Sequence, residues 1–188
     1  MTTDTERPLR ADARRNREKI LATAVRVFAE HGLDVRIHRI AEEAGVGTGT
    51  LYRNFPTREN LIEAAYRQEL SRLCEAAPEL LAAMPPHAAL RSWMGHFLDY
   101  ARVQRGMADA LHAVIDSDVD RSVSRELMVT ALTSLVDAAV ADGTIRSDIS
   151  AADMLAGLTG VALATGRPEQ RAQAERLLDL LLAGCAAT

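Results

Sequence analysis

The sequence predicts an all-α protein of about nine helices. Apolar residues make up 48% of the 188 residues, and they are mainly Ala, Leu and Val, with only 4% aromatic residues in the chain. This composition favours helices over sheets, since Ala and Leu are strong helix formers. Apolar positions also recur every three or four residues along most of the chain, and Gly and Pro stand between the periodic segments.

Two helices are predicted in the first 45 residues. Over 12–31, apolar positions keep helical spacing, and Gly32 follows as a terminating residue that can adopt a positive φ. A shorter periodic stretch over about 36–44 ends in the same way at Gly45. Each of these two helices therefore has a defined end.

The segment VGTGTLYRNF, residues 46–55, predicts a third helix over about 48–54. Gly47 can serve as its N-cap, and Leu51 and Phe55 form a narrow apolar edge. Because only about three residues separate the second helix from the third, the pair predicts a helix-turn-helix.

The outer face of this third helix is suited to duplex DNA. It carries Thr48, Gly49, Tyr52 and Arg53. Small residues let a helix approach the major groove closely, and hydroxyl and guanidinium groups can reach base edges and phosphates. A surface helix without a partner would show the same periodicity, so that alternative stays open. A nucleotide-binding glycine loop is disfavoured, because the segment follows a helix and lacks the GK[ST] ending.

A long fourth helix is predicted over 57–76, capped by Thr57 after Pro56 has ended the third. Prolines at positions 78, 85 and 86 then interrupt the chain where its character changes, and a domain boundary is expected there. Five further helices are predicted over 87–104, 106–115, 121–141, 150–165 and 168–184.

Residues 17–66, REKILATAVRVFAEHGLDVRIHRIAEEAGVGTGTLYRNFPTRENLIEAAY, resemble the DNA-binding domain of the TetR/AcrR family of bacterial transcriptional regulators. The likeness joins a first helix ending in FAEHG to IAEEAGV, GTLYRNF and TREN, in this order. It implies a three-helix helix-turn-helix DNA-binding domain over 10–56, with the motif itself over about 37–56. Residues 57–188 would form a larger helical ligand-binding and dimerisation bundle, with the helix over 57–76 as connector.

The resemblance also implies a sequence-specific transcriptional regulator, expected to be a repressor that a small-molecule effector releases from its operator. Its DNA contacts are expected from Arg36, Arg39, Thr48, Gly49, Thr50, Tyr52, Arg53, Asn54 and Arg58. In the family pattern Thr48 and Gly49 match positions that face bases, whereas Thr50, Tyr52 and Asn54 match residues that grip phosphates.

The chain departs from the family pattern at two places. Gly47 stands where a serine cap is usual, which costs the helix only roughly a few tenths of a kcal/mol. Arg36, Ile37 and His38 replace the frequent threonine-rich start of the second helix. Arg36 and Arg39 are therefore the candidate substitutes for the phosphate contacts of the missing hydroxyls.

Charge is distributed unevenly along the chain. Residues 1–58 hold eleven Lys and Arg against eight Asp and Glu, whereas residues 59–188 hold eleven against eighteen, within a net charge of −4. A basic first third is what a chain would show if only that part meets a polyanion. Arg14, Arg15 and Arg17 are expected to contact the DNA backbone.

The middle helices carry a candidate effector pocket. Its residues are Trp93, Met94, Phe97, Tyr100, Met107, Leu111, His112, Ile115, Met128 and Leu132. Methionines and aromatic residues with a few polar tips line adaptable ligand cavities, and the family resemblance implies a small-molecule site here. A plain hydrophobic core would show the same stripe, and that alternative carries equal weight.

A homodimer is expected, because one helix-turn-helix buries too little surface for tight binding and a two-fold dimer suits a palindromic duplex operator. The interface is predicted from Leu155, Leu158, Val161, Ala162, Leu177, Leu178 and Leu181 on the last two helices. Alternatively, the last helix is only central core.

Several other functions are disfavoured. No apolar run approaches a membrane span and the N-terminus lacks a secretory signal, so a cytoplasmic protein without a membrane partner is expected. No cofactor, metal site or enzymatic activity is expected, because the histidines and cysteines are scattered and no nucleophile stands beside a base. The alternative to a DNA-binding regulator is an all-helical protein-interaction adaptor without DNA binding.

Overall fold

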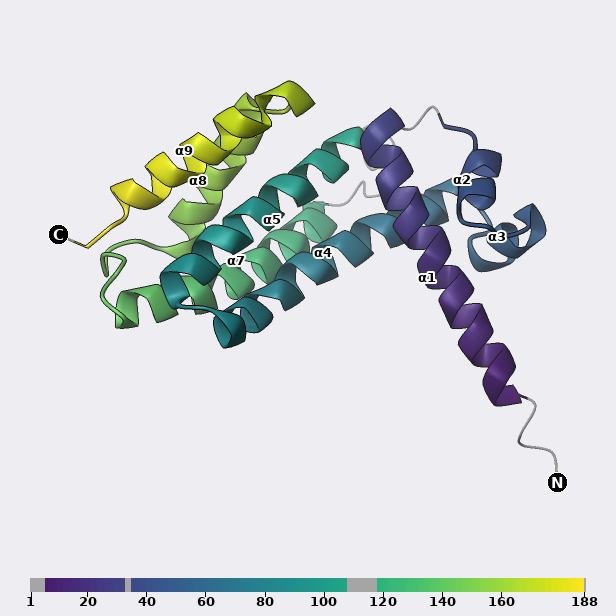
Figure 1. Cartoon of the computed structure of the whole chain (residues 1–188), viewed down its shortest axis with the longest axis horizontal. Coiled ribbons are helices and arrows are strands. Elements are labelled where there is room, and N and C mark those ends of the chain that lie inside the picture. The colour runs from purple at the N-terminus through teal and green to yellow at the C-terminus, as the bar shows by residue number, and fades with distance from the viewer. Residues whose placement is uncertain (1–5, 33–34, 108–117, 188) are drawn as a thin grey trace. The chain divides into compact units, whose positions relative to one another are not determined.

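The computed structural model describes residues 6–32, 35–107 and 118–187. Within these ranges the protein contains eight α-helices and one short 3₁₀ helix, and its extended structure is limited to an isolated antiparallel bridge between Ile145 and Ala186 (Figure 1). The predicted all-α class is confirmed. The helix predicted over 106–115 lies, apart from its first two positions, outside the described residues.

The helices follow the predicted order. They are α1 Glu6–His31, α2 Ile37–Glu43, α3 Thr48–Asn54, α4 Arg58–Ala83, α5 Pro86–Gly106, α7 Asp118–Ala141, α8 Ala151–Ala164, the 3₁₀ helix η1 Pro168–Gln170 and α9 Arg171–Gly184. α1 begins six residues before the predicted start at position 12, and a 3₁₀ turn replaces the predicted α-helical start of the last helix.

The length of α4 corrects the prediction that this helix ends at about residue 76. α4 continues to Ala83 with Pro78 inside it. Pro78 lies on the exposed side of the helix, while the apolar side runs on past it through the partly buried Leu80 and Leu81. Packing of that side outweighs the one backbone hydrogen bond that the proline removes.

The described helices belong to two compact units. One comprises Met1–Gln68 and Val103–Asp116, and the other comprises Glu69–Arg102 and Ser117–Thr188. α4 therefore begins in the first unit and ends in the second, and α5 begins in the second and ends in the first.

The first unit holds the helix-turn-helix, which confirms that prediction. α1 contacts both α2 and α3, and α2 contacts α3. Their shared core contains Phe28 of α1, Ile40 of α2 and Leu51 of α3, all fully buried. Gly45 makes the corner between α2 and α3 with a φ of 66°, a conformation that favours glycine. The core thus holds α3 by its apolar side.

The second unit is a bundle in which α7 packs on α8 and α8 packs on α9. Gly157 makes the last contact close, because a Cβ at this position would lie 3.1 Å from the methyl groups of Leu181. α5 is joined to the second part of α4 by Trp93, whose buried indole Nε1 donates a 2.8 Å hydrogen bond to the Leu73 carbonyl.

Candidate nucleic-acid interface

α3 is a helix of seven residues that begins without a side-chain cap. Gly47 occupies the N-cap in an extended conformation, and its carbonyl accepts hydrogen bonds from the backbone N–H of Thr50 at 2.8 Å and of Leu51 at 3.1 Å. The predicted N-cap is confirmed. Because so short a helix is unstable alone in water, packing against α1 and α2 must hold it.

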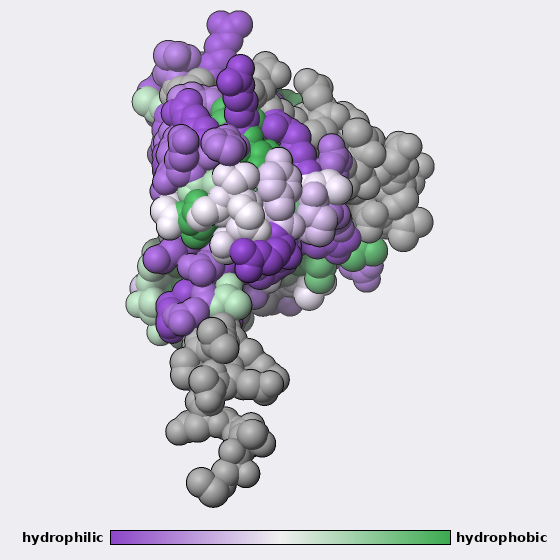
Figure 2. Space-filling model, turned by 90° about the vertical axis from the view of Figure 1, so that its right-hand side faces the viewer, coloured by the Kyte–Doolittle hydropathy of each residue, from purple (hydrophilic) through white to green (hydrophobic). Residues whose placement is uncertain are grey.

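One side of α3 is buried and the opposite side faces outward. Leu51 is 0% exposed and Phe55, the C-cap, is 2% exposed. Gly49, Tyr52 and Arg53 are exposed, and Thr48 is half-buried. In the view of Figure 2, weakly hydrophilic side chains, drawn nearly white, form a patch that strongly hydrophilic side chains border. α3 therefore presents small and hydroxyl-bearing residues beside charged ones.

Arg53 folds back along α3 over Gly49. Its Nε donates a 3.2 Å hydrogen bond to the Gly49 carbonyl. A Cβ added at Gly49 would meet only this guanidinium, at 3.9 Å, which is an ordinary van der Waals contact. Packing inside the protein therefore does not require glycine at position 49.

Arg58, expected at a DNA phosphate, also has a structural contact. Its Nη1 donates a 2.8 Å hydrogen bond to the carbonyl of Val35, just ahead of α2, and the side chain is half-buried. The start of α4 is thereby tied to the start of the helix-turn-helix. This bond uses one of the five N–H groups that an arginine carries.

Arg39, also expected at the DNA, belongs to a charged network between α1 and α2. Its Nε donates to Glu43 at 2.7 Å and its Nη2 donates to His31 Nε2 at 3.0 Å. Arg26 of α1 donates to the other carboxylate oxygen of Glu43 at 2.6 Å. Hydrogen bonds from Arg39 and then Arg26 lower the pKa of Glu43. By contrast, Arg36 is exposed at the N-cap of α2 and makes no capping hydrogen bond with its side chain.

The three α1 arginines expected at the DNA backbone, Arg14, Arg15 and Arg17, have different surroundings. Arg15 pairs with Asp12, and Arg14 lies 3.5 Å from Glu18. Arg17 instead reaches α3, where it contacts the Asn54 carbonyl and the Phe55 ring.

His38 lies beside the expected DNA-contacting residues although the sequence analysis did not include it among them. Its Nδ1 is 3.5 Å from Thr48 Oγ1, and the imidazole is exposed. His38 could have been predicted as a polar neighbour of α3 from its place in the Arg36–His38 stretch, which replaces the usual hydroxyl-bearing residues. This contact brings α2 and the start of α3 onto one polar surface.

Comparison with known proteins accounts for both halves of the chain. Residues 20–65 match the family described as bacterial regulatory proteins, tetR family, and residues 85–187 match the C-terminal domain described as transcriptional regulator SbtR-like. The chain belongs to the TetR family. It is therefore a DNA-binding transcriptional regulator with a helix-turn-helix, and the family is not enzymatic. Regulators of this family bind DNA operators and small-molecule effectors, typically as dimers.

Solved structures of TetR regulators are similar over nearly the whole chain. A TetR transcriptional regulator of Streptomyces coelicolor is 62% identical, with a TM-score of 0.85 over 92% of this chain and 99% of that one. A TetR transcription regulatory protein of Mycobacterium vanbaalenii is 34% identical, with a TM-score of 0.79 over 96% of this chain and 100% of that one.

Among curated proteins, an HTH-type transcriptional regulator of Staphylococcus aureus is 38% identical over 63 residues, or 33% of this chain. The chain spans about a third, 34%, of the length of that curated relative. The match is thus confined to a segment the size of the DNA-binding domain.

The residues expected to line an effector pocket of this TetR-family chain are largely buried. Trp93, Met94, Phe97, Tyr100, Met107 and Leu132 are at most 4% exposed, and Met128 is half-buried. Trp93 stacks on Phe97 with ring centroids 6.1 Å apart, and Phe97 lies 6.2 Å from Tyr100. Leu111, His112 and Ile115 lie outside the described residues.

The residues expected at a dimer interface divide into two groups. Leu155, Leu158, Ala162 and Leu178 are buried within the chain, and Val161, Leu177 and Leu181 are half-buried. Leu163 of α8 and Leu180 of α9, which do not belong to the predicted set, are 73% and 67% exposed.

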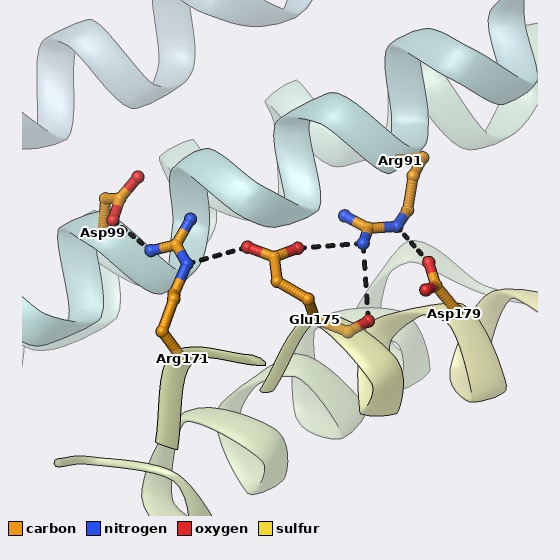
Figure 3. Close-up of polar contacts among 5 residues, drawn as sticks. All are labelled: Arg91, Asp99, Arg171, Glu175 and Asp179. Atoms are coloured by element: carbon orange, nitrogen blue, oxygen red, sulfur yellow. Dashed lines mark hydrogen bonds and ion pairs between the residues drawn. The ribbon is translucent and has the colours of Figure 1, made fainter. Parts of the chain in front are cut away.

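A chain of charged residues joins α9 to α5 (Figure 3). Arg91 of α5 donates to Asp179 at 2.6 Å and to Glu175 at 2.8 Å. Arg171 donates to the other oxygen of Glu175 at 2.7 Å and also pairs with Asp99 of α5. Glu175 thus lies between two arginines, and α9 is fixed to α5 along its exposed edge.

Within the part of the chain that the structure describes, no helix is long and apolar enough to cross a bilayer.

Proposed function

We propose that α3 is the recognition helix of a sequence-specific regulator, expected to be a repressor that a small molecule releases from a palindromic operator. The observation that carries the proposal is the outward face of α3, where Gly49, Tyr52 and Arg53 are exposed over the buried Leu51 and Phe55. Such a face suits insertion into a major groove, because Gly49 allows a close approach of the helix backbone while Tyr52 and Arg53 offer polar groups to base edges and phosphates.

Each polar residue of this face has a proposed role. Thr48 and Gly49 face the bases, and Arg53 reaches a guanine or a phosphate once it leaves the Gly49 carbonyl. Thr50, Tyr52, Asn54, Arg36, Arg39 and Arg58 contact phosphates. Arg39 and Arg58 do so with N–H groups that their intramolecular bonds to Glu43, His31 and Val35 do not use.

The protein acts as a homodimer through α8 and α9 in this proposal. The exposed Leu163 and Leu180, flanked by the half-buried Val161, Leu177 and Leu181, supply the apolar surface that the partner covers. Leucines exposed to this degree on two adjoining helices are typical of a surface that is covered in the assembled protein.

The effector binds among the aromatic residues of α5, with Met128 and Leu132 of α7, in this proposal. Residues 10–56 form the DNA-binding domain and residues 57–188 the ligand-binding and dimerisation domain, with α4 as connector. Its continuity from one compact unit into the other supports that role. We place the protein in the cytoplasm, where chromosomal DNA lies, and assign it no catalytic activity.

The experiment is selection of duplexes from a randomised library by the wild-type protein, followed by anisotropy measurements on the selected duplex and on a scrambled duplex. We expect a selected sequence with two-fold symmetry and a binding constant that falls steeply with salt. Thr48→Ala should weaken binding to the selected duplex roughly fivefold or more, through the lost base contact.

Thr130→Ala is the matched control, because Thr130 is an exposed threonine of α7. It should leave both affinities unchanged. If no sequence is selected and the DNA affinity is weak and independent of salt concentration, the proposal is contradicted and a protein-interaction adaptor is favoured.

A further inference from the structure

Arg17 connects α1 to the carboxyl end of α3. Its Nη1 donates to the Asn54 carbonyl at 3.4 Å, and its guanidinium carbon lies 4.5 Å from the centre of the Phe55 ring. Asn54 is the last helical residue of α3, and Phe55 is its buried C-cap. A single side chain of α1 therefore touches both the end and the anchor of α3.

The end of α3 is the place where such a contact matters. A helix leaves its last carbonyl groups without backbone partners, and they carry the negative end of the helix dipole. The Asn54 side chain turns back along the helix, since its Nδ2 donates to the Thr50 carbonyl at 2.9 Å. Arg17 supplies a charged donor to the carbonyl of Asn54 itself. At the N-terminal end Gly47 is the N-cap, so no side-chain capping bond is made there.

Neighbouring arginines of α1 do not share this geometry. Arg14 and Arg15 pair with acidic residues of α1 itself, Glu18 and Asp12. Arg17 is the one of the three that contacts a residue of another helix, 37 positions along the chain. Its planar guanidinium can stack on a ring and donate to a carbonyl at the same time, which an ammonium group cannot do.

We propose that Arg17 is a positioning residue for DNA recognition, which fixes the carboxyl end of α3 through Asn54 and Phe55. Its contribution to sequence-specific affinity then comes from the orientation of α3 and not from neutralising a phosphate. The inference rests on the proposed function, since it takes α3 as the recognition helix.

The test compares Arg17→Lys and Arg17→Gln with the wild type on the duplex that the wild type selects and on a scrambled duplex. Arg17→Lys keeps the charge but loses the stack, so affinity for the selected duplex should fall roughly fivefold or more. Affinity for the scrambled duplex should stay unchanged. Arg17→Gln should lose selectivity in the same way, with the slope of log affinity against log salt concentration unaltered.

Arg125→Lys and Arg125→Gln are the matched controls, because Arg125 is an exposed arginine of α7, in the unit that does not hold the helix-turn-helix. They should leave selectivity unchanged. Arg17 would instead be a phosphate contact if Arg17→Gln weakened binding to both duplexes and reduced the salt slope by about 0.9. Unchanged selectivity in both Arg17 variants would overturn the inference as well. Failure of the wild type to prefer any duplex would count against the proposed function and not against Arg17 alone.

Discussion

Among the single residues of α3, Gly49 is a glycine that the fold does not require. Its backbone needs no positive φ, and a Cβ there would make only an ordinary contact with Arg53. Glycine is a poor helix former, so α3 would be more stable with alanine at this position. The bare backbone is therefore better explained by what approaches α3 from outside than by the fold.

We expect Gly49→Ala to raise the free energy of unfolding by up to about 1 kcal/mol, because alanine favours the helix. The same methyl group should hold the helix away from the base edges and weaken binding to the selected duplex roughly tenfold. Urea unfolding and fluorescence anisotropy measure the two effects.

Gly95→Ala is the control, since Gly95 lies within α5 and a Cβ there would meet nothing within 4 Å. It should stabilise the protein without changing DNA affinity. A Gly49→Ala variant that binds DNA as tightly as the wild type would show that the backbone of α3 does not approach the bases at this residue.

The outward face of α3 could be predicted from the sequence because helical periodicity places Thr48, Gly49, Tyr52 and Arg53 opposite Leu51 and Phe55. The contacts of the arginines could be predicted less well. The Arg39–Glu43 pair has the i, i+4 spacing that a sequence shows directly. The Arg58 bond to Val35 joins residues far apart in the chain, so only the folded arrangement of α2 and α4 reveals it.

For whole elements, the chain of charges between α5 and α9 decides how firmly α9 is held. Glu175 is partly buried, which opposes its ionisation. The hydrogen bond from Arg91 and the charge and hydrogen bond of Arg171 outweigh that effect and lower the pKa of the Glu175 carboxyl. Its ionised form is therefore favoured in the folded protein.

We expect Glu175→Gln to lower the free energy of unfolding at neutral pH by roughly 1 kcal/mol, since the pairs are partly solvent-screened. Because the folded-state pKa lies below that of the unfolded chain, the contribution of Glu175 is complete above the ordinary glutamate pKa of about 4.3. It is lost as the pH falls through the folded-state pKa. The difference between wild type and variant should thus shrink on acidification, as measured by urea unfolding at several pH values.

Glu126→Gln, at an exposed residue of α7, serves as the control and should follow the wild-type curve. Stability curves of wild type and Glu175→Gln that stay parallel down to acidic pH would mean that the carboxylate does not contribute through its charge.

Helix ends were harder to predict than the helices themselves. The predicted end of α4 at about residue 76 is wrong, because the apolar side continues through Leu80 and Leu81 and keeps the helix intact past Pro78. Gly32, Gly45 and Gly143, each with a positive φ, mark true helix ends. In this chain, a glycine with a positive φ therefore predicts the end of a helix better than a proline on the exposed side of the helix does.

For the whole molecule, the proposed homodimer depends on the surface that α8 and α9 leave uncovered. The sequence shows two helices that are apolar on more than one side, but it does not show which side faces the protein's own core. Leu158 and Leu178 are buried inside the chain, whereas Leu163 and Leu180 are exposed and are the residues that the proposed partner would cover. The predicted interface residues are in this respect partly the core of the second unit.

We expect Leu180→Glu to give a folded monomer, because a charge in an apolar interface is costly to bury. Its affinity for the selected duplex should fall roughly a hundredfold or more, since the two halves of the operator no longer bind one linked pair of recognition helices. Sedimentation velocity and anisotropy test the two effects.

Leu127→Glu is the control, because Leu127 is an exposed leucine of α7. It should remain a dimer with wild-type affinity. A Leu180→Glu variant that still sediments as a dimer would place the interface elsewhere.

The sharing of α4 and α5 between the two compact units also bears on how the protein can be dissected. Val103 and Met107, close to the end of α5, are buried members of the unit that contains the helix-turn-helix. A fragment cut after Gln68 would lack these two side chains, although it would keep every residue of α1, α2 and α3. We therefore expect that the amino-terminal portion, transplanted onto another regulator, would need the end of α5 as well.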